Sequence, residues 1–226
     1  HDQRFFHWEL DFASVFAKGG FDLQVGNPPW VRPRVVENDL LAEGDPWWHL
    51  TTGAKQAEIK ERRQQTLALP GIRDLVVNES SAVLDQSAFM AAPATYPHLT
   101  GLQPDTYRCF MELTWQNMSE DGAISLIHPD SHFTDTKAGP LRAATYGHLR
   151  RHWQFINEKL LFAEIHDLVS YGIHVYGSPR PSPSFLNAVS LYIPETVERS
   201  FDHDGSGAEP GIKDLDGNWD TRPHSD

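Results

Sequence analysis

The sequence has little cysteine and no long hydrophobic run. Its single cysteine, Cys109, excludes a disulfide framework and is typical of a protein kept in a reducing cytoplasm. No stretch approaches the roughly 20 apolar residues that a membrane-spanning helix requires. No charged-then-apolar leader of the kind that directs secretion is present either. These absences predict a cytoplasmic protein that uses no membrane.

Net positive charge is also missing. Nineteen Lys and Arg stand against 31 Asp and Glu, for a formal charge of −12. A surface that grips nucleic acid needs clustered basic residues, so the chain as a whole is not expected to be one. The acidic residues are concentrated in the last third of the chain, and a separate domain could bind DNA. The negative net charge therefore does not exclude DNA as a partner. The apolar content of 39% fits a globular protein. A start at His1 and a polar end indicate a piece of a longer polypeptide.

The most informative stretch is residues 20–30. Phe21–Val25 is apolar and bounded by glycine on both sides, which predicts a buried strand. The strand leads into Asn27, Pro28, Pro29 and Trp30. Two consecutive prolines hold φ near about −65° and remove two N–H donors, so the loop is stiff and its carbonyls stay outside any helix.

This loop has the groups to bind a planar amine. Asn27 offers a side-chain carbonyl, and the backbone carbonyl of Asn27 or Pro28 offers a second acceptor. Two fixed acceptors suit an NH2 group, which has two hydrogens to donate. Trp30 adds a flat apolar face on which a ring could stack. The predicted ligand is an exocyclic amine on a planar ring or an amide.

The strand, its glycine and the Asn-Pro-Pro-Trp loop resemble the catalytic motif of gamma-class DNA adenine-N6 methyltransferases. The block FFHWELDF at residues 5–12 and later blocks in residues 104–226 resemble the large single-chain methylases of restriction–modification and phage-defence systems. The resemblance implies an α/β fold, the C-terminal half of a class I (Rossmann-like) methyltransferase sheet. It also implies S-adenosylmethionine as cofactor and double-stranded DNA with a flipped adenine as substrate.

Residues 1–194 are therefore interpreted as a partial catalytic domain with an insertion at about 31–104, and 195–226 as a polar linker or the start of a following region. Within the insertion, the tryptophans near residue 47 are more simply packed under a loop than exposed for stacking on a base. After residue 104 the pattern predicts a helix closed at 120–122, a strand at 123–127 and a helix at 141–149. A strand at 152–156 follows, and 171–176 with 188–193 could form a hairpin.

The resemblance also implies roles for individual residues. Asn27 and the carbonyl of Pro28 would accept the two N6 hydrogens, while Pro29 keeps the loop rigid. Trp30 would stack on one face of the base. Phe162 occupies the position at which the family offers a second aromatic ring, although ordinary core packing explains it equally well.

No metal site is predicted. His128 with His132, and His148 with His152, have a spacing that can hold a metal on a helix. The first pair spans Pro129 and the second straddles a helix end, and neither has a cysteine cluster beside it. These histidines are interpreted as structural.

A complete enzyme of this kind would also need a strand followed by a Gly-rich turn and an acidic residue to hold its cofactor. Gly19 and Gly20 end a helix, and the Gly-x-Gly at 205–207 lies in the polar tail, so neither serves. The cofactor residues therefore stay unassigned, with most of that pocket expected elsewhere in the parent polypeptide. Two alternatives stay open: a non-catalytic DNA-binding or assembly remnant, and a methyltransferase that acts on protein glutamine or RNA.

Overall fold

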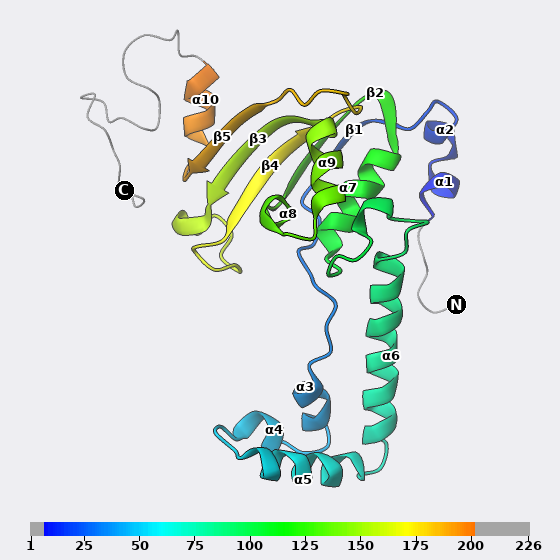
Figure 1. Cartoon of the computed structure of the whole chain (residues 1–226), viewed down its shortest axis with the longest axis vertical. Coiled ribbons are helices and arrows are strands. Elements are labelled where there is room, and N and C mark those ends of the chain that lie inside the picture. Colours follow the sequence, from blue (N-terminus) through cyan, green and yellow to red (C-terminus); the bar gives the residue numbers. More distant parts are fainter. Residues whose placement is uncertain (1–6, 202–226) are drawn as a thin grey trace, which may run out of the picture. The chain divides into compact units, whose positions relative to one another are not determined.

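The computed structural model describes residues 7–201, and they form two compact units. The described part of the first unit comprises residues 7–30 and 106–201, and the second unit is Val31–Asp105. Figure 1 shows the first unit built around a sheet and the second built from helices. None of the described helices is long and apolar enough to cross a membrane.

A mixed five-stranded sheet organises the first unit. The spatial order of the strands is β1-β2-β4-β3-β5. β1 runs parallel to β2 and β3 runs parallel to β5, whereas β4 is antiparallel to both of its neighbours. The strands are β1 (Phe21–Gly26), β2 (Met118–Pro129), β3 (Leu149–Ile156), β4 (Ser170–Tyr176) and β5 (Leu186–Leu191). This arrangement gives the α/β character that the sequence predicts.

The helices of the first unit are short, and three of them cover one face of the sheet. Figure 1 shows α7, α8 and α9 in front of the strands. The bounds are α1 (Trp8–Asp11), α2 (Ala13–Phe16), α7 (Thr106–Gln116), α8 (Ser131–Thr134), α9 (Gly139–His148), the 3-10 turn η2 (Asn157–Lys159) and α10 (Glu195–Phe201). Pro140 lies in the first turn of α9, where its missing N–H costs no helical hydrogen bond.

The two faces of the sheet differ in character because side chains alternate along each strand. In β4, Tyr171 and Ile173 join an apolar cluster with Phe155 and Leu191. The intervening His174 and Tyr176 point to the other face, toward α7, α8 and α9, where the ring of Trp115 contacts that of Tyr176. One face is therefore aromatic and aliphatic, and the other carries histidines.

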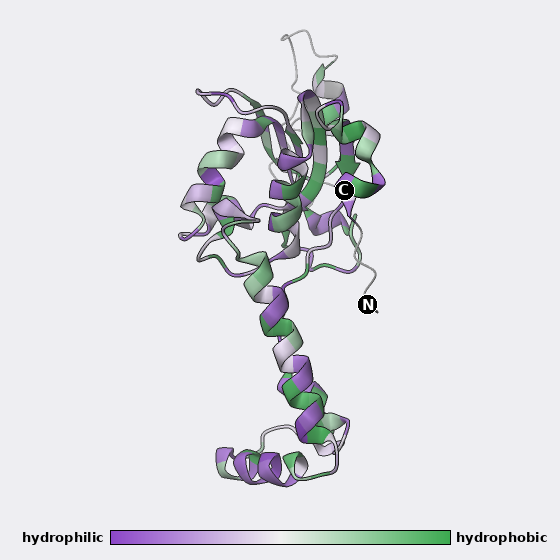
Figure 2. Cartoon of the chain, turned by 90° about the vertical axis from the view of Figure 1, so that its right-hand side faces the viewer, coloured by the Kyte–Doolittle hydropathy of each residue, from purple (hydrophilic) through white to green (hydrophobic). Residues whose placement is uncertain are grey.

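The second unit packs four helices around a small core and also contains a 3-10 turn. They are α3 (Glu37–Ala42), α4 (Trp47–Leu50), α5 (Gln56–Leu67), α6 (Ile72–Met90) and η1 (Pro97–Leu99). Leu41, Trp48, Ile72 and Val76 form the core, and the indole N–H of Trp48 donates to Thr66 at 3.0 Å. Figure 2 shows α5 as mostly hydrophilic. The interpretation of the tryptophans as packed residues is confirmed for Trp48.

The structure corrects several expectations. The predicted hairpin is wrong, since β4 pairs with β2 and β3 while β5 pairs with β3. The predicted helix does not extend to residue 122: α7 ends at Gln116, and β2 already begins at Met118. The polar segment after Pro194 opens with a helix, α10, whose first turn is closed by the amide of Val197 donating to the carbonyl of Pro194 at 3.0 Å. The remainder, including the glycines at 205–207, lies outside the described residues.

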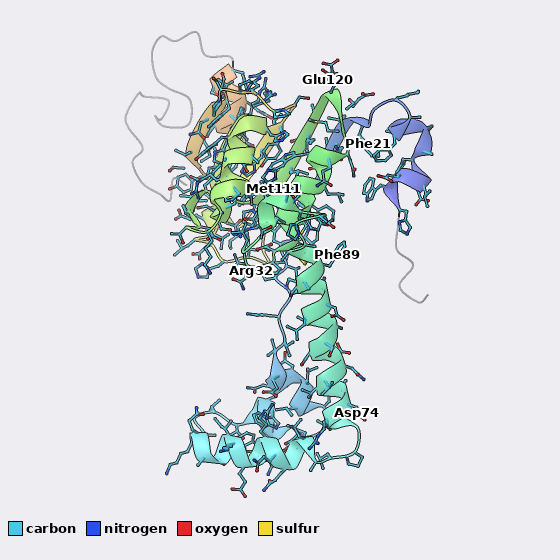
Figure 3. The ribbon with its side chains drawn as sticks, turned by 45° about the vertical axis from the view of Figure 1, so that its right-hand side comes forward. Phe21, Arg32, Asp74, Phe89, Met111 and Glu120 are labelled. Atoms are coloured by element: carbon cyan, nitrogen blue, oxygen red, sulfur yellow. The ribbon has the colours of Figure 1, made fainter. Side chains whose placement is uncertain are left out.

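β1 is a strand as predicted, but it is not buried. It forms one end of the sheet within the described residues, and Leu23 and Val25 are 65% and 72% exposed. The ring of Phe21 is covered by aromatic groups: it meets those of Trp8, Phe12 and Phe16 edge-on at 5.3–5.7 Å. Figure 3 shows Phe21 on the side where α1 and α2 lie. The side chains of β1 are exposed because the strand lies at the end of the described sheet. The spacing of apolar residues in the sequence does not reveal that position.

Candidate functional site

The Asn-Pro-Pro-Trp loop leaves β1 beside the end of β2. Because the two strands are parallel and Gly26 pairs with Leu126, their carboxyl ends lie at the same edge of the sheet. Trp30 is held there by its indole N–H, which donates to the carbonyl of Ile127 at 3.3 Å. The carboxyl edge of a parallel pair is where open α/β sheets bind ligands. The loop therefore stands where a substrate site is expected.

The two prolines anchor the loop while leaving Asn27 accessible. Pro28 is buried, whereas Asn27 and Pro29 are exposed. The hydroxyl of Thr106, at the start of α7, donates to the carbonyl of Pro29. This hydrogen bond ties the loop to α7. The roles of Asn27 and Pro28 as acceptors for a ligand stay predictions.

Three aromatic rings gather beside the loop. The centroids of Trp30 and Phe162 are 5.3 Å apart, and those of Trp30 and Tyr171 are 6.0 Å apart. Phe162 and Tyr171 meet edge-on at 4.8 Å. Burial raises the pKa of the Tyr171 phenol, so this side chain stays neutral and presents an aromatic surface. The structure thus brings Trp30 and Phe162 together across 132 positions of sequence.

Trp30 and Phe162 touch each other directly and leave no slot between them. A base sandwiched between two rings needs planes about 7 Å apart, since each stacking contact spans about 3.5 Å. Their ring planes here are inclined at 52°. A base enters between them only if the loop that carries Phe162 moves aside.

Asn157 builds the loop that carries Phe162, and sequence reasoning missed it. This fully buried residue follows β3, and its Nδ2 donates to the carbonyls of Phe162 at 2.8 Å and Ile165 at 3.1 Å. Its Oδ1 accepts the amide N–H of Phe162 at 3.0 Å. An asparagine directly after an apolar strand is a turn signal, and that signal could have identified it.

Gly20 fixes the start of β1. It has a φ of +119°, and a Cβ placed there would lie 2.6 Å from the carbonyl oxygen of Asn117. The close approach lets β1 begin alongside β2, because the N–H of Phe21 donates to that same carbonyl at 2.8 Å. Gly20 is therefore a packing glycine, and the described residues near β1 show no Gly-rich turn that could hold a nucleoside cofactor.

The histidines lie on the opposite face of the sheet. His128 and His132 do come together, with ring centroids 5.3 Å apart, and burial lowers the pKa of both well below the ordinary value of 6.5. His148 and His152 do not form a pair: His148 stacks on Trp115 at 4.6 Å, and its Nδ1 contacts the carbonyl of Gly177 at 2.9 Å.

His152 instead joins Asp130 and His174. The Nε2 atoms of these two histidines lie 3.3 and 3.1 Å from Oδ1 of Asp130. Burial opposes ionisation of that carboxyl group, but the neighbouring imidazoles prevail and lower its pKa. For His174, burial lowers the pKa, although the carboxylate acts in the opposite direction. Sequence spacing gives no sign of this trio, which comes from three separate segments.

Comparison with known proteins gives one family match. Residues 1–64 match the family described as Eco57I restriction-modification methylase, a stretch that includes the Asn-Pro-Pro-Trp loop. This match supports a methyltransferase role. A search of curated protein sequences finds no match.

Three solved structures are similar at low identity. The DrdV–DNA complex has a TM-score of 0.42 and 12% identity over 80% of this chain and 16% of that one. The ATP-dependent Type ISP restriction-modification enzyme LlaBIII bound to DNA has a TM-score of 0.35 and 12% identity, over 74% of this chain and 10% of that one. A nuclease-deletion mutant of the Type ISP restriction-modification enzyme LlaGI in complex with a DNA substrate mimic has a TM-score of 0.39 and 10% identity, over 78% of this chain and 15% of that one. This chain thus spans 16% or less of each of those chains.

Proposed function

We propose that this chain is the substrate-binding part of a methyltransferase that transfers a methyl group from S-adenosylmethionine to N6 of adenine in DNA. In this proposal it acts within a larger restriction–modification or phage-defence methylase. The observation that carries the proposal is the loop itself: an exposed Asn27 and a stiff Pro28-Pro29 pair at the carboxyl edge of two parallel strands, with Trp30 beside them. The family match over residues 1–64 supports it.

The chemistry follows from the two acceptors. An adenine that has left the duplex places its N6 hydrogens on the side-chain carbonyl of Asn27 and the main-chain carbonyl of Pro28. The two hydrogen bonds direct the nitrogen lone pair out of the plane of the amine. They also stabilise the positive charge that grows on nitrogen during attack. No nucleophilic side chain is required, which agrees with a buried Cys109 that takes no part.

Trp30 supplies the surface on which the base stacks, worth about 1–3 kcal/mol for a base on an aromatic side chain. Its indole N–H is tied to Ile127, so the ring is pre-oriented before the base arrives. Phe162 closes over the base from the other side after its loop moves. The donor supplies an electrophilic methyl group when it is bound, and most of its pocket is expected outside the described residues.

The test uses the complete parent polypeptide, because the donor pocket is expected outside these residues. Asn27→Ala should abolish transfer of labelled methyl groups to DNA while the circular dichroism spectrum is unchanged. Asn78→Ala, which alters an exposed asparagine in α6, is the matched control and should keep full activity. Retained transfer in Asn27→Ala would refute the role of this residue.

The same assay separates the alternative substrates. Incorporation into DNA should be lost when adenine is replaced by a base without an exocyclic amine at that position. Labelling of RNA or of a protein glutamine in place of DNA would favour the second kind of methyltransferase.

A second candidate function is a non-catalytic assembly module. The exposed apolar side chains of Leu23 and Val25 on β1 favour it, since an exposed strand of this kind invites pairing with another segment. A parent polypeptide that transfers no methyl group to any nucleic acid or protein, yet needs residues 21–26 to assemble, would support this function over the first.

A further inference from the structure

The histidine-bearing face of the sheet holds a buried trio of metal-binding side chains that the proposed function does not use. Asp130 follows β2, and His152 and His174 face each other across β3 and β4. Their side chains are at least nine-tenths buried. One ligand atom from each lies within 4.8 Å of the other two. Register explains the meeting of the histidines, because directly opposed residues in an antiparallel pair place their side chains together.

The hydrogen bonds of the two rings fix which nitrogen faces the carboxylate. Nδ1 of His174 lies 3.1 Å from the main-chain carbonyl of Gly172, which can only accept, so Nδ1 carries the hydrogen. Nδ1 of His152 lies 2.9 Å from Oδ1 of Asn187 and is occupied in the same way. Nε2 of each ring is therefore the nitrogen that faces Oδ1 of Asp130. One ligand atom from each of the three residues thus converges on a single point, where a cation can bind.

Several atoms here have no hydrogen-bond partner among the described residues. They are Oδ2 of Asp130, Nε2 of His174 and both ring nitrogens of His132, all buried. The contact between His174 and Asp130 is short, yet its geometry does not make a hydrogen bond. Buried polar atoms almost always find partners, so this concentration of exceptions points to an absent ligand. His128 does not contribute, since its two nitrogens already contact the carbonyl of Pro129 and the hydroxyl of Tyr176.

We propose that Asp130, His152 and His174 bind a divalent transition-metal ion, with Zn²⁺ the best match. In a tetrahedral site with bonds of about 2.0–2.2 Å, ligand atoms are about 3.3–3.6 Å apart. The separations of 3.3 and 3.1 Å between each Nε2 and Oδ1 of Asp130 fall at or just below this range. Each ring donates its other N–H to an oxygen, the second contact that metal-bound histidines typically make. Two imidazoles and a carboxylate suit zinc, whereas calcium and magnesium prefer oxygen ligands.

Gly172 keeps the necessary space open. A Cβ at this position would lie 2.8 Å from both Oδ1 of Asp130 and Nε2 of His174, so a side chain there would crowd the ligand atoms. His132 is a candidate fourth ligand, because its ring centroid is 5.8 Å from that of His174 and both of its ring nitrogens lack a hydrogen-bond partner among the described residues. Because the three ligand side chains are at least nine-tenths buried, the ion would be structural and would tie the segment after β2 to β3 and β4.

The test measures metal in the full chain, expressed in medium supplemented with zinc because a buried site fills during folding. After dialysis, elemental analysis should find about one zinc per chain, as for a single structural site. Expression with Co²⁺ in place of zinc should produce the visible absorption bands of a tetrahedral cobalt site. His174→Gln and Asp130→Asn should each remove the bound metal. His166→Gln, at an exposed histidine beside Asp167, should retain it.

Variants that fail to fold do not decide the matter, because the unaltered chain gives a result by itself. Wild-type protein that folds with no bound zinc and shows no cobalt bands would overturn the proposal. So would bound metal that His166→Gln loses and His174→Gln keeps. If nitrogen NMR of metal-free wild type found both rings fully protonated and unchanged by added zinc, a proton would satisfy the cluster instead, and the metal site would be refuted.

Discussion

Asn157 offers a sharp test of how the aromatic site is built. Its side chain makes three hydrogen bonds of 2.8–3.1 Å, two to Phe162 and one to Ile165, in a fully buried position. Each such bond contributes about 1 kcal/mol net. Asn157→Ala removes all three and is expected to lower the free energy of unfolding by about 3 kcal/mol. Asn157→Asp keeps the acceptor for the Phe162 amide but sets a buried carboxylate oxygen against the carbonyls of Phe162 and Ile165, so it should lose at least as much.

Urea titrations followed by circular dichroism measure this loss, and hydrogen exchange at the Phe162 amide reports the loop itself. That amide should exchange faster in Asn157→Ala, because its acceptor is gone. Asn78→Ala, on the exposed side of α6, should change the free energy of unfolding by less than about 0.5 kcal/mol. A loss below about 1 kcal/mol in Asn157→Ala, with unchanged exchange at Phe162, would show that the loop is held by other contacts.

Two further outcomes are expected. Gly20→Ala should destabilise the fold by about 1–3 kcal/mol in a urea titration. The φ of Gly20 is +119°, and the new Cβ would clash with the carbonyl of Asn117. Gly19→Ala is the control and should cost less, because Gly19 also has a positive φ but a Cβ there would meet no atom within 4 Å. Acid should also destabilise the unit that contains α7: the amide of Lys137 and the guanidinium of Arg108 hold the pKa of Asp135 below its ordinary value of 3.8. A carboxyl group with a lowered pKa stabilises the fold at pH values above its ordinary pKa, and this stabilisation is lost as the pH falls through the lowered pKa. In thermal melts, the melting temperature of Asp135→Asn should therefore decline less steeply below pH 3.8 than that of the unaltered chain. An equally steep decline in both proteins would contradict this.

The local patterns of the chain were enough to predict most of its strands. Glycine at both ends of an apolar run predicted β1, and the proline pair predicted a stiff loop beside it. The helical spacing after residue 104 predicted α7, although it placed the end too late. These features succeed because backbone preference and short-range alternation act within a few residues.

Strand partners and exposure were not predictable in this way. The hairpin between β4 and β5 was expected from their order along the chain, but β3 lies between them in the sheet. Leu23 and Val25 have the composition of a buried strand, yet they are largely exposed because β1 ends the described sheet. A strand's pairing depends on which other segments reach it, and that information is spread over the whole chain.

The sequence by itself determined that a stiff Pro28-Pro29 loop follows β1. The roles that it assigns to Asn27, Pro28 and Trp30 stay predictions. Only the tertiary structure placed Phe162 against Trp30 and gathered Asp130, His152 and His174 around one point. The physical reason is the same for both, because each contact joins segments that are distant in sequence and that no local preference brings together. Asn157 and Phe162, by contrast, lie close in sequence, and their hydrogen bonds are local.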